Sequence, residues 1–395
     1  MTAAEVLIVV EADIATTQII EQIVAACASH GVGYKKRQLK ELCADDFQPQ
    51  ILPLFIRCCD PETVLWTRAL KNAGRSYIYY IDDNFWKITG GTAVAEYYRH
   101  PRVRKALEFT VKNARFVVTS SAELARFLSR LNERVVVLPA SFDFTLVDGV
   151  TCEPTNEVRI GFAGSTSRAA DLDVIAPIIE STLHTFRDVV FEFAGAMPNG
   201  ISAGPRVRFF PYDGDYGRYI KFQRQRNWAI GLAPLFDHDA NRCKTDNKYR
   251  EYSGCGFAGI YSNIPPYADV IEDGVTGLLV GNDPAAWMAA IERLIERPLE
   301  RSTIAANAGR DVRQRYQLSH VAPQWAEFLL GVAKEQGGQR KRVQPAALAL
   351  RRRFARLNSM LMRIDVVYES GGLSLLFNRL ARKILRAPPW SLLRL

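Results

Sequence analysis

The sequence has no run of apolar residues that approaches the roughly 18 needed for a membrane-spanning helix. Its first ten residues hold an acidic residue, Glu5, and no basic region before a short apolar run, so we expect no secretory signal. The seven cysteines are odd in number and lack CxxC spacing, which argues against a disulfide framework or a zinc ribbon. We therefore expect a cytoplasmic protein whose cysteines act as small buried apolar residues.

The length of 395 residues predicts two or three domains. Hydrophobic residues make up 48% and charged residues 24%, a balance typical of a globular protein with a sizeable core. The net charge of +9 indicates an acidic partner: nucleic acid, an anionic membrane surface or a phosphate-bearing substrate. That charge lies at one end of the chain. Residues 340–395 hold 13 Lys and Arg against two Asp and Glu, a net charge of +11, and the remainder carries −2.

Short β-rich runs alternate with helical patterns in both halves of the chain, on either side of a polar linker at residues 145–157. Strands are predicted at residues 6–10, 51–56, 77–81, 116–119 and 135–138, and then at 158–162, 189–193, 207–210, 230–233, 259–262 and 277–280. Helices are predicted at residues 16–29, 103–112, 122–131, 171–183, 216–227 and 247–253, and from Asp283-Pro284 onwards. Continuous apolar strands separated by helices predict an α/β fold with two doubly wound, Rossmann-like domains.

We divide the chain into an N-terminal domain at residues 1–148, a C-terminal domain at 149–335 and a tail at 336–395. Two such domains leave a cleft at the carboxyl ends of their strands, where ligands bind. The tail contains two stretches with apolar residues on one helical face and basic residues around them: Leu350, Phe354, Leu357, Leu361 and Ile364, then Leu373, Phe377, Leu380 and Ile384. This pattern predicts basic amphipathic helices at an anionic membrane surface. The alternative is a pair of helices packed on the protein or on a partner.

A turn of small residues follows the first strand of the second half, and its candidate phosphate-binding residues are Gly164, Ser165, Thr166 and Arg168. Small residues let backbone N–H groups approach a phosphate, a helix N-terminus favours negative charge, and an arginine adds donors. The alternative is a tight turn capped by Ser or Thr. A second candidate group, Lys244, Lys248, Glu251 and Tyr252, lies around a predicted helix. Two ammonium groups could neutralise a diphosphate and one carboxylate could accept both ribose hydroxyls, whereas the alternative is a solvated Lys248–Glu251 ion pair.

These segments resemble the donor-binding half of GT-B glycosyltransferases, most closely the bacterial group 1 (family 4-like) enzymes. The resemblance rests on residues 244–256, 260–262 and 270–280, of which the Asp-Gly-x-Thr-Gly-Leu-Leu-Val motif at 273–280 is the most specific. Residues 160–164, 191–195 and 230–234 match the same half in the same order, and 79–86 and 117–121 resemble the acceptor domain. The resemblance covers roughly residues 5–330.

The resemblance implies a diphosphate site at Gly164, Ser165, Arg168, Lys244 and Lys248, and a ribose contact at Glu251. A second glutamate of the family, which contacts the donor sugar, would stand eight residues before Glu251, where this sequence has Cys243. The donor sugar and the choice between retention and inversion therefore stay open. The resemblance also implies that the leaving diphosphate is stabilised without a metal ion.

Two adjacent carboxylates, Asp82 and Asp83, follow a predicted strand on the acceptor side of the cleft. Either could act as general base on an acceptor hydroxyl, as an inverting transfer requires. The alternative is a loop start with a helix cap. Asp213-Gly-Asp215 could be read as a metal-binding motif, but we expect Asp215 to cap the helix that begins at Tyr216.

The leading interpretation is a glycosyltransferase that moves a sugar from a nucleotide-diphosphate sugar to a glycan or lipid-linked glycan in cell-envelope polysaccharide synthesis. Two alternatives stay open: a non-catalytic GT-B-like scaffold subunit at the membrane, and a sugar-nucleotide epimerase on the same fold. The predicted domains show no nucleic-acid reader motif, so we expect no nucleic-acid partner. We expect no cofactor besides the donor, no metal, and attachment to the inner face of the membrane through residues 340–395.

Overall fold

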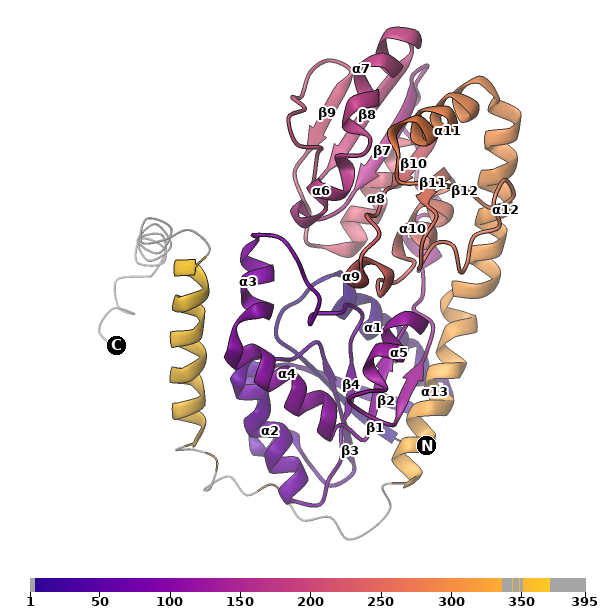
Figure 1. Ribbon diagram of the computed structural model, residues 1–395. Coiled ribbons are helices and arrows are strands. Elements are labelled where there is room, and N and C mark those ends of the chain that lie inside the picture. The colour runs from indigo at the N-terminus through magenta and orange to yellow at the C-terminus, as the bar shows by residue number, and fades with distance from the viewer. Residues whose placement is uncertain (1–3, 336–342, 344–347, 349–350, 370–395) are drawn as a thin grey trace, which may run out of the picture.

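The computed structural model describes residues 4–335, 343, 348 and 351–369. Most of these residues form two lobes, one above the other in Figure 1. Each lobe is built on a six-stranded parallel sheet flanked by helices. The predicted α/β class with two doubly wound domains is therefore confirmed.

The strands of the first sheet lie in the order β2-β1-β3-β4-β5-β6. These strands are β1 (Ala4–Val10), β2 (Val32–Gln38), β3 (Ile51–Ile56), β4 (Ile78–Tyr80), β5 (Phe116–Thr119) and β6 (Val135–Val137). The helices of this part of the chain are α1 (Ala15–Ala26), α2 (Pro61–Asn72), α3 (Ala93–Arg99), α4 (Pro101–Asn113) and α5 (Ala122–Leu128). Every residue of β3 is buried because the strand lies inside the sheet with both faces covered, which explains its wholly apolar sequence.

The edge strand β2 is not among the predicted strands. Its sequence is Val-Gly-Tyr-Lys-Lys-Arg-Gln, and only Val32 is fully buried. An edge strand pairs on one side alone, and charged residues along it discourage pairing with other chains. Such a strand carries no apolar run, so hydrophobic patterning does not find it.

The strands of the second sheet lie in the order β12-β11-β10-β7-β8-β9. They are β7 (Val158–Ala163), β8 (Val189–Ala194), β9 (Val207–Phe210), β10 (Ile230–Ala233), β11 (Ala258–Ser262) and β12 (Leu278–Val280). The helices that follow β7 are α6 (Ala169–Leu172), α7 (Ala176–Thr185), α8 (Tyr216–Arg226), α9 (Asp239–Arg242), α10 (Asn247–Cys255), α11 (Pro284–Glu296), α12 (Pro298–Tyr316) and α13 (Leu318–Glu335). The single helix predicted at residues 171–183 is wrong, because the chain forms α6 and α7 instead. Pro177 lies in the first turn of α7, where its missing N–H costs nothing.

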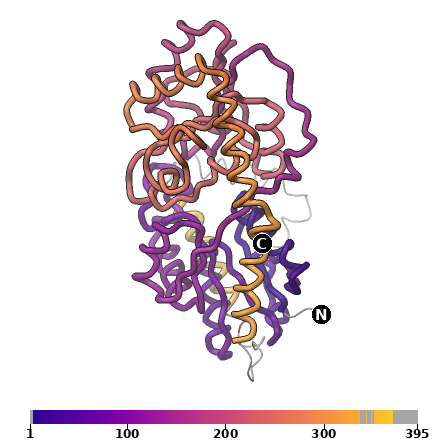
Figure 2. Tube along the Cα trace, turned by 90° about the vertical axis from the view of Figure 1, so that its right-hand side faces the viewer, coloured from indigo at the N-terminus to yellow at the C-terminus, as the bar shows by residue number. Residues whose placement is uncertain are grey.

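The long helices α12 and α13 run along one side of both lobes, as Figure 2 shows in orange. Helix α12 packs on the second lobe, whereas α13 returns to the first lobe. There the Trp325 indole N–H donates to the Pro139 carbonyl over 2.9 Å. The backbone N–H of Phe142 donates to the Tyr316 carbonyl over 2.8 Å, so the two segments that pass between the lobes lie side by side.

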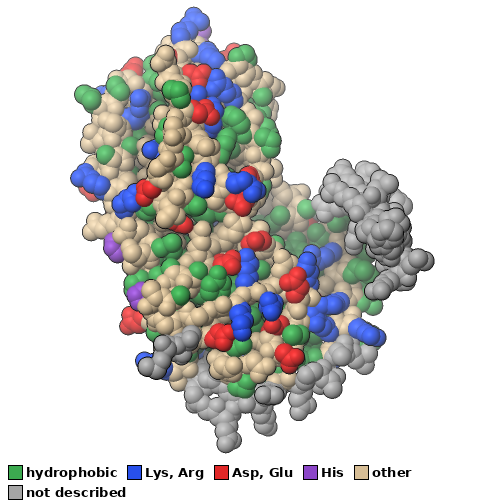
Figure 3. Space-filling model, turned by 180° about the vertical axis from the view of Figure 1, so that it is seen from behind, with side chains coloured by type: hydrophobic (Ala, Val, Ile, Leu, Met, Phe, Trp, Pro, Cys, Tyr) green, Lys and Arg blue, Asp and Glu red, His purple; other side chains and the backbone are tan. Residues whose placement is uncertain are grey.

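Residues 351–369 form a further helix, which we call the C-terminal helix; it lies beside the first lobe in Figure 1. Met362 and Val366 are buried against that lobe. A helix is thus present in the predicted tail, while the second predicted stretch, from Leu373, lies outside the described residues. In the part of the chain that the structure describes, no helix is long and apolar enough to cross a bilayer. Basic and acidic side chains are interspersed over the face shown in Figure 3.

Candidate functional site

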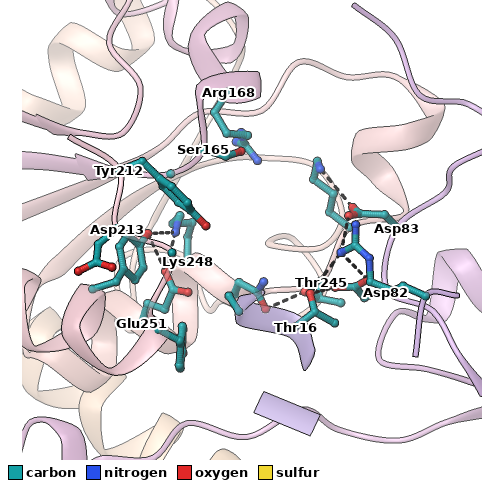
Figure 4. A pocket seen from close by; sticks show the side chains of 18 of the residues that line it. Thr16, Asp82, Asp83, Ser165, Arg168, Tyr212, Asp213, Thr245, Lys248 and Glu251 are labelled. Carbon is teal, nitrogen blue, oxygen red and sulfur yellow. Dashed lines mark hydrogen bonds and ion pairs between the residues drawn. The ribbon is translucent and has the colours of Figure 1, made fainter. Parts of the chain in front are cut away.

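A pocket of about 200 Å³ lies between the lobes, where the carboxyl ends of strands from both sheets meet. Figure 4 shows Thr16, Asp82 and Asp83 on one side of it, and residues of the second lobe on the other. Eight of the ten predicted site residues line this pocket: Asp82, Asp83, Gly164, Ser165, Arg168, Lys244, Lys248 and Glu251. The sequence analysis placed the two carboxylates of the first half and the donor-binding residues of the second half at one cleft, and the structure brings these eight residues together.

The two carboxylates after β4 differ in their surroundings. Asp82 is 7% exposed, and both of its oxygens are engaged: Oδ1 lies 3.0 Å from the Arg57 guanidinium and Oδ2 accepts from the Thr16 hydroxyl over 2.5 Å. Burial and the neighbouring charge of Asp83 raise the pKa of Asp82, although Arg57 opposes the shift. Burial alone would raise the pKa of Asp83 too, but Lys244 and Arg57 hold it below its ordinary value. Of the two carboxylates, Asp83 therefore has the lower pKa.

Arg57 is a pocket residue that the sequence analysis did not single out. It follows β3 directly and adopts a left-handed backbone conformation with φ of +55°, which is costly for a residue with a side chain. Its guanidinium contacts Asp82 and lies 3.4 Å from Asp83, over the ring of Phe85 at 4.7 Å. An arginine immediately after a fully apolar strand was the available signal, because the carboxyl ends of parallel strands line the cleft.

The turn after β7 forms one wall of the pocket. The N–H of Gly164 donates to the Ala194 carbonyl, and a Cβ on Gly195 would lie only 2.2 Å from the Gly164 oxygen, so this close approach of two turns requires glycine. Ser165 precedes one turn of 3₁₀ helix and then the four-residue α6. The helix expected to begin at this turn is therefore short. Arg168 is the cation of this wall, and its guanidinium pairs with Asp171 at 2.9 Å.

Lys248 and Glu251 form a buried ion pair on α10, with 2.5 Å between Nζ and Oε2 and side chains only 12% and 6% exposed. Lys248 also donates to the Tyr219 hydroxyl over 2.8 Å, and that hydroxyl lies 3.5 Å from the Glu251 carboxylate. Burial lowers the pKa of Lys248, while Glu251 partly offsets the shift. The alternative of a solvated pair is therefore wrong: the pair is held away from water beside the pocket.

Two predicted donor-binding residues do not line the pocket. Thr166 is exposed outside it. Tyr252 lies in the core, where its ring packs against Gly231 and its hydroxyl donates to the Leu232 carbonyl. Cys243, at the position of the family's second glutamate, is buried at the contact between the lobes, 3.5 Å from the Asn84 amide nitrogen.

The acidic residues that invited a metal-binding interpretation have other partners. Asp213 forms an ion pair with Arg218 at 2.8 Å, and Asp215 caps α8 by accepting from the Arg218 backbone N–H, as predicted. Within the described ranges, no three His, Cys, Asp or Glu side chains gather as ligands for a metal ion.

A second, apolar pocket of about 230 Å³ adjoins the first and shares Tyr212, Asp213 and Tyr219 with it. Phe210 and Phe222 complete an aromatic lining. Flat aromatic walls suit a planar heterocycle. The two pockets together offer an aromatic compartment, the buried Glu251 carboxylate and the cationic side chains of Arg57, Arg168, Lys244 and Lys248.

Among solved structures the chain is similar to HepE of Anabaena in complex with UDP-glucose, with a TM-score of 0.62 and 14% identity, over 83% of this chain and 99% of that one. It is also similar to sucrose-phosphate synthase of Thermosynechococcus elongatus, with a TM-score of 0.60 and 12% identity over 84% and 100% of the two chains. An α-glucosyltransferase in complex with UDP-glucose and DNA gives a TM-score of 0.56 and 10% identity over 82% and 99%. No model of a protein family and no curated protein matches the sequence. The structural likenesses show that the chain has the GT-B fold.

Proposed function

We propose that this protein is a glycosyltransferase that moves a sugar, a hexose or a related one, from a nucleotide-diphosphate sugar to a hydroxyl acceptor. The observation that carries the proposal is the arrangement of Arg168, Lys244 and Lys248 around one pocket, where Lys244 reaches Asp83 of the first lobe. Three cations converge where a diphosphate leaving group would develop charge, and fixed charges at that point are an effective way to lower the barrier.

In this proposal the donor extends across both pockets. Its diphosphate contacts Arg168, Lys244 and Lys248 beside the Gly164–Ser165 turn, its ribose hydroxyls bind Glu251, and its base enters the aromatic compartment. Two of the similar structures named above, HepE and the α-glucosyltransferase, contain UDP-glucose, so UDP-sugars are the first donors to test. The donor is a substrate, and we propose a metal-independent transfer without a further cofactor.

The acceptor hydroxyl would approach from the first lobe. We propose Asp83 rather than Asp82 as the general base of an inverting transfer, because the Asp83 side chain is 31% exposed and that of Asp82 only 9%. The test is a donor screen read by mass spectrometry, with a membrane lipid extract as acceptor. Transfer of a sugar supports the proposal, whereas donor consumption without an acceptor points to the epimerase and the absence of any reaction to the scaffold subunit.

We further propose that the acceptor is a glycan or lipid-linked glycan of cell-envelope polysaccharide synthesis, and that the protein works on the inner, cytoplasmic face of the membrane. Residues 340–395 carry a net charge of +11, which favours attraction to anionic lipid, while the rest of the chain is nearly neutral. An enzyme held at the membrane would meet a lipid-linked acceptor by diffusion along the membrane surface. The proposed membrane contact of the tail is therefore consistent with the proposed acceptor.

A further inference from the structure

The C-terminal helix, residues 351–369, has apolar side chains on two opposite faces. Its inner face packs Met362 and Val366 on the first lobe. Its outer face carries large apolar side chains at spacings of three and four residues that are 37% to 65% exposed, and we call them the outer stripe: Phe354, Leu357, Leu361, Ile364 and Tyr368. A continuous exposed apolar stripe is typical of a surface that contacts a partner.

Buried carboxylates fix the rotation of this helix. Arg352 pairs with Glu62 and Arg363 with Asp60, each at 3.0 Å, and these two carboxylates lie at the start of α2 and are only 5% and 3% exposed. Ser359 also bonds Asp60. Turning the outer stripe inward would leave both carboxylates buried without their partners, which is costly. The helix therefore presents the stripe outward while it stays on the lobe.

The charge of the surrounding sequence identifies the partner. Arg351 and Arg353 are exposed on the helix itself, and the flanking segments add the basic residues of 340–342 and 379–386. A second copy of the chain would bring together two segments of +11 each, which repel, whereas an anionic bilayer attracts the same segment. Apolar side chains between arginines are typical of helices that lie in the membrane interface.

We propose that the outer stripe of the docked C-terminal helix inserts into the interface of an anionic phospholipid bilayer, an inference that rests on the proposed membrane location. Asp365 reaches His100 at the junction of α3 and α4, and the Asn358 carbonyl accepts from Arg102. The helix thus lies along the first lobe, as Figure 1 shows, so a bilayer bound to the stripe would lie on the acceptor side of the protein.

The test is flotation of the full chain with two kinds of vesicle, pure phosphatidylcholine and an equimolar mixture with phosphatidylglycerol. The variant is Leu357→Gln with Leu361→Gln, which removes apolar surface without changing charge and keeps a residue of similar helix propensity. The matched control is Leu299→Gln, because Leu299 is 83% exposed on α12, away from the helix. We expect wild type and control to float with the anionic vesicles, and the bound fraction of the double variant to fall about tenfold or more.

Undiminished flotation of the double variant would overturn the inference, as would a wild type that binds neither vesicle. A wild type that dimerises without lipid, together with a monomeric double variant, would also overturn it, since a second copy would then cover the stripe. Nucleotide binding measured on the same preparations should be equal in all three proteins. Its absence from all three would count against the proposed function, independently of flotation.

Discussion

Lys244 and Asp83 join the two lobes across the pocket, with Lys244 Nζ 3.2 Å from Asp83 Oδ1. The lysine precedes α10 of the second lobe, and the carboxylate follows β4 of the first. Both side chains are about three-tenths exposed. Lys244 therefore already has an anionic partner at the place where we propose the donor diphosphate, and the donor must compete with Asp83 for it.

This competition predicts that Asp83→Asn tightens nucleotide binding although it removes the proposed base. We expect nucleoside diphosphate affinity to rise about two- to fivefold, the range typical of a partly exposed ion pair, while transfer falls sharply. The gain should vanish in a Lys244→Met background, because no competition is then left to relieve. Asp239→Asn is the matched control, since Asp239 pairs with Lys87 between the same lobes outside the pocket. Equal or weaker binding by Asp83→Asn would contradict the competition.

Glu251 is predicted to bind the ribose, so Glu251→Gln should weaken nucleoside diphosphate binding about 10- to 100-fold, the worth of a charge-assisted hydrogen bond. The amide can still accept from Lys248 and Tyr219, so we expect a folded protein. Glu251→Ala should bind as weakly and also unfold more easily, because it leaves the buried Lys248 without its partner. Calorimetric titration and thermal unfolding separate these two effects. Wild-type affinity in both variants would exclude Glu251 from the site.

Arg57 is predicted to position the carboxylates of the first lobe without touching the donor. Arg57→Met should lower kcat at least tenfold, because Asp82 and Asp83 lose their shared cation and their pKa values rise. Nucleoside diphosphate affinity should stay within about twofold of wild type, since the cations of the second lobe are untouched. Steady-state kinetics and a titration with the nucleotide give both numbers. A large loss of affinity with unchanged kcat would show that Arg57 acts on the donor instead.

Glu11 directly follows β1 and accepts hydrogen bonds from the backbone N–H groups of Cys59 and Asp60 and from the Tyr97 hydroxyl. Burial and the charge of Asp60 raise the pKa of Glu11 to about 7. A carboxyl whose pKa is raised on folding stabilises the protein fully below its unfolded-state pKa, and this contribution is lost as the pH rises through 7.

Glu11→Gln should therefore gain stability relative to wild type between about pH 5 and pH 8, by on the order of 2 kcal/mol. Urea unfolding at the two pH values measures this gain. Glu41→Gln is the control, because Glu41 is exposed on the same lobe. A constant difference between Glu11→Gln and wild type across this range would show that Glu11 is ionised throughout.

Hydrophobic patterning predicts the parts of this fold that are buried on both faces. Strands such as β3 are apolar throughout, so the sequence marks them, while the solvated edge strand β2 carries no such pattern. The sequence does not predict the break between α6 and α7. Pro177 can either interrupt a helix or stand in its first turn, and packing decides which of these occurs. The apolar face that forms the outer stripe can be recognised in the sequence. The side of the helix that packs inward cannot, because it depends on ion pairs with Asp60 and Glu62.

The candidate site also contains some contacts that the sequence predicts and others that it does not. Lys248 and Glu251 are three residues apart on one helix, so spacing alone brings them together. Arg57 and Asp83 follow different strands of the first sheet, and Asp83 meets Lys244 through the arrangement of the two lobes, which no local pattern contains. Tyr252 neighbours the site in sequence yet points into the core, because adjacent residues of a helix face different directions.

The most direct test of the account is calorimetric titration of the full-length protein with a panel of nucleoside diphosphates, UDP first, alongside Lys248→Ala. We expect at least one nucleotide to bind wild type, and Lys248→Ala to weaken that binding at least tenfold while remaining folded. If no nucleotide in the panel binds, or if Lys248→Ala binds as well as wild type, the pocket between the lobes is not the donor site.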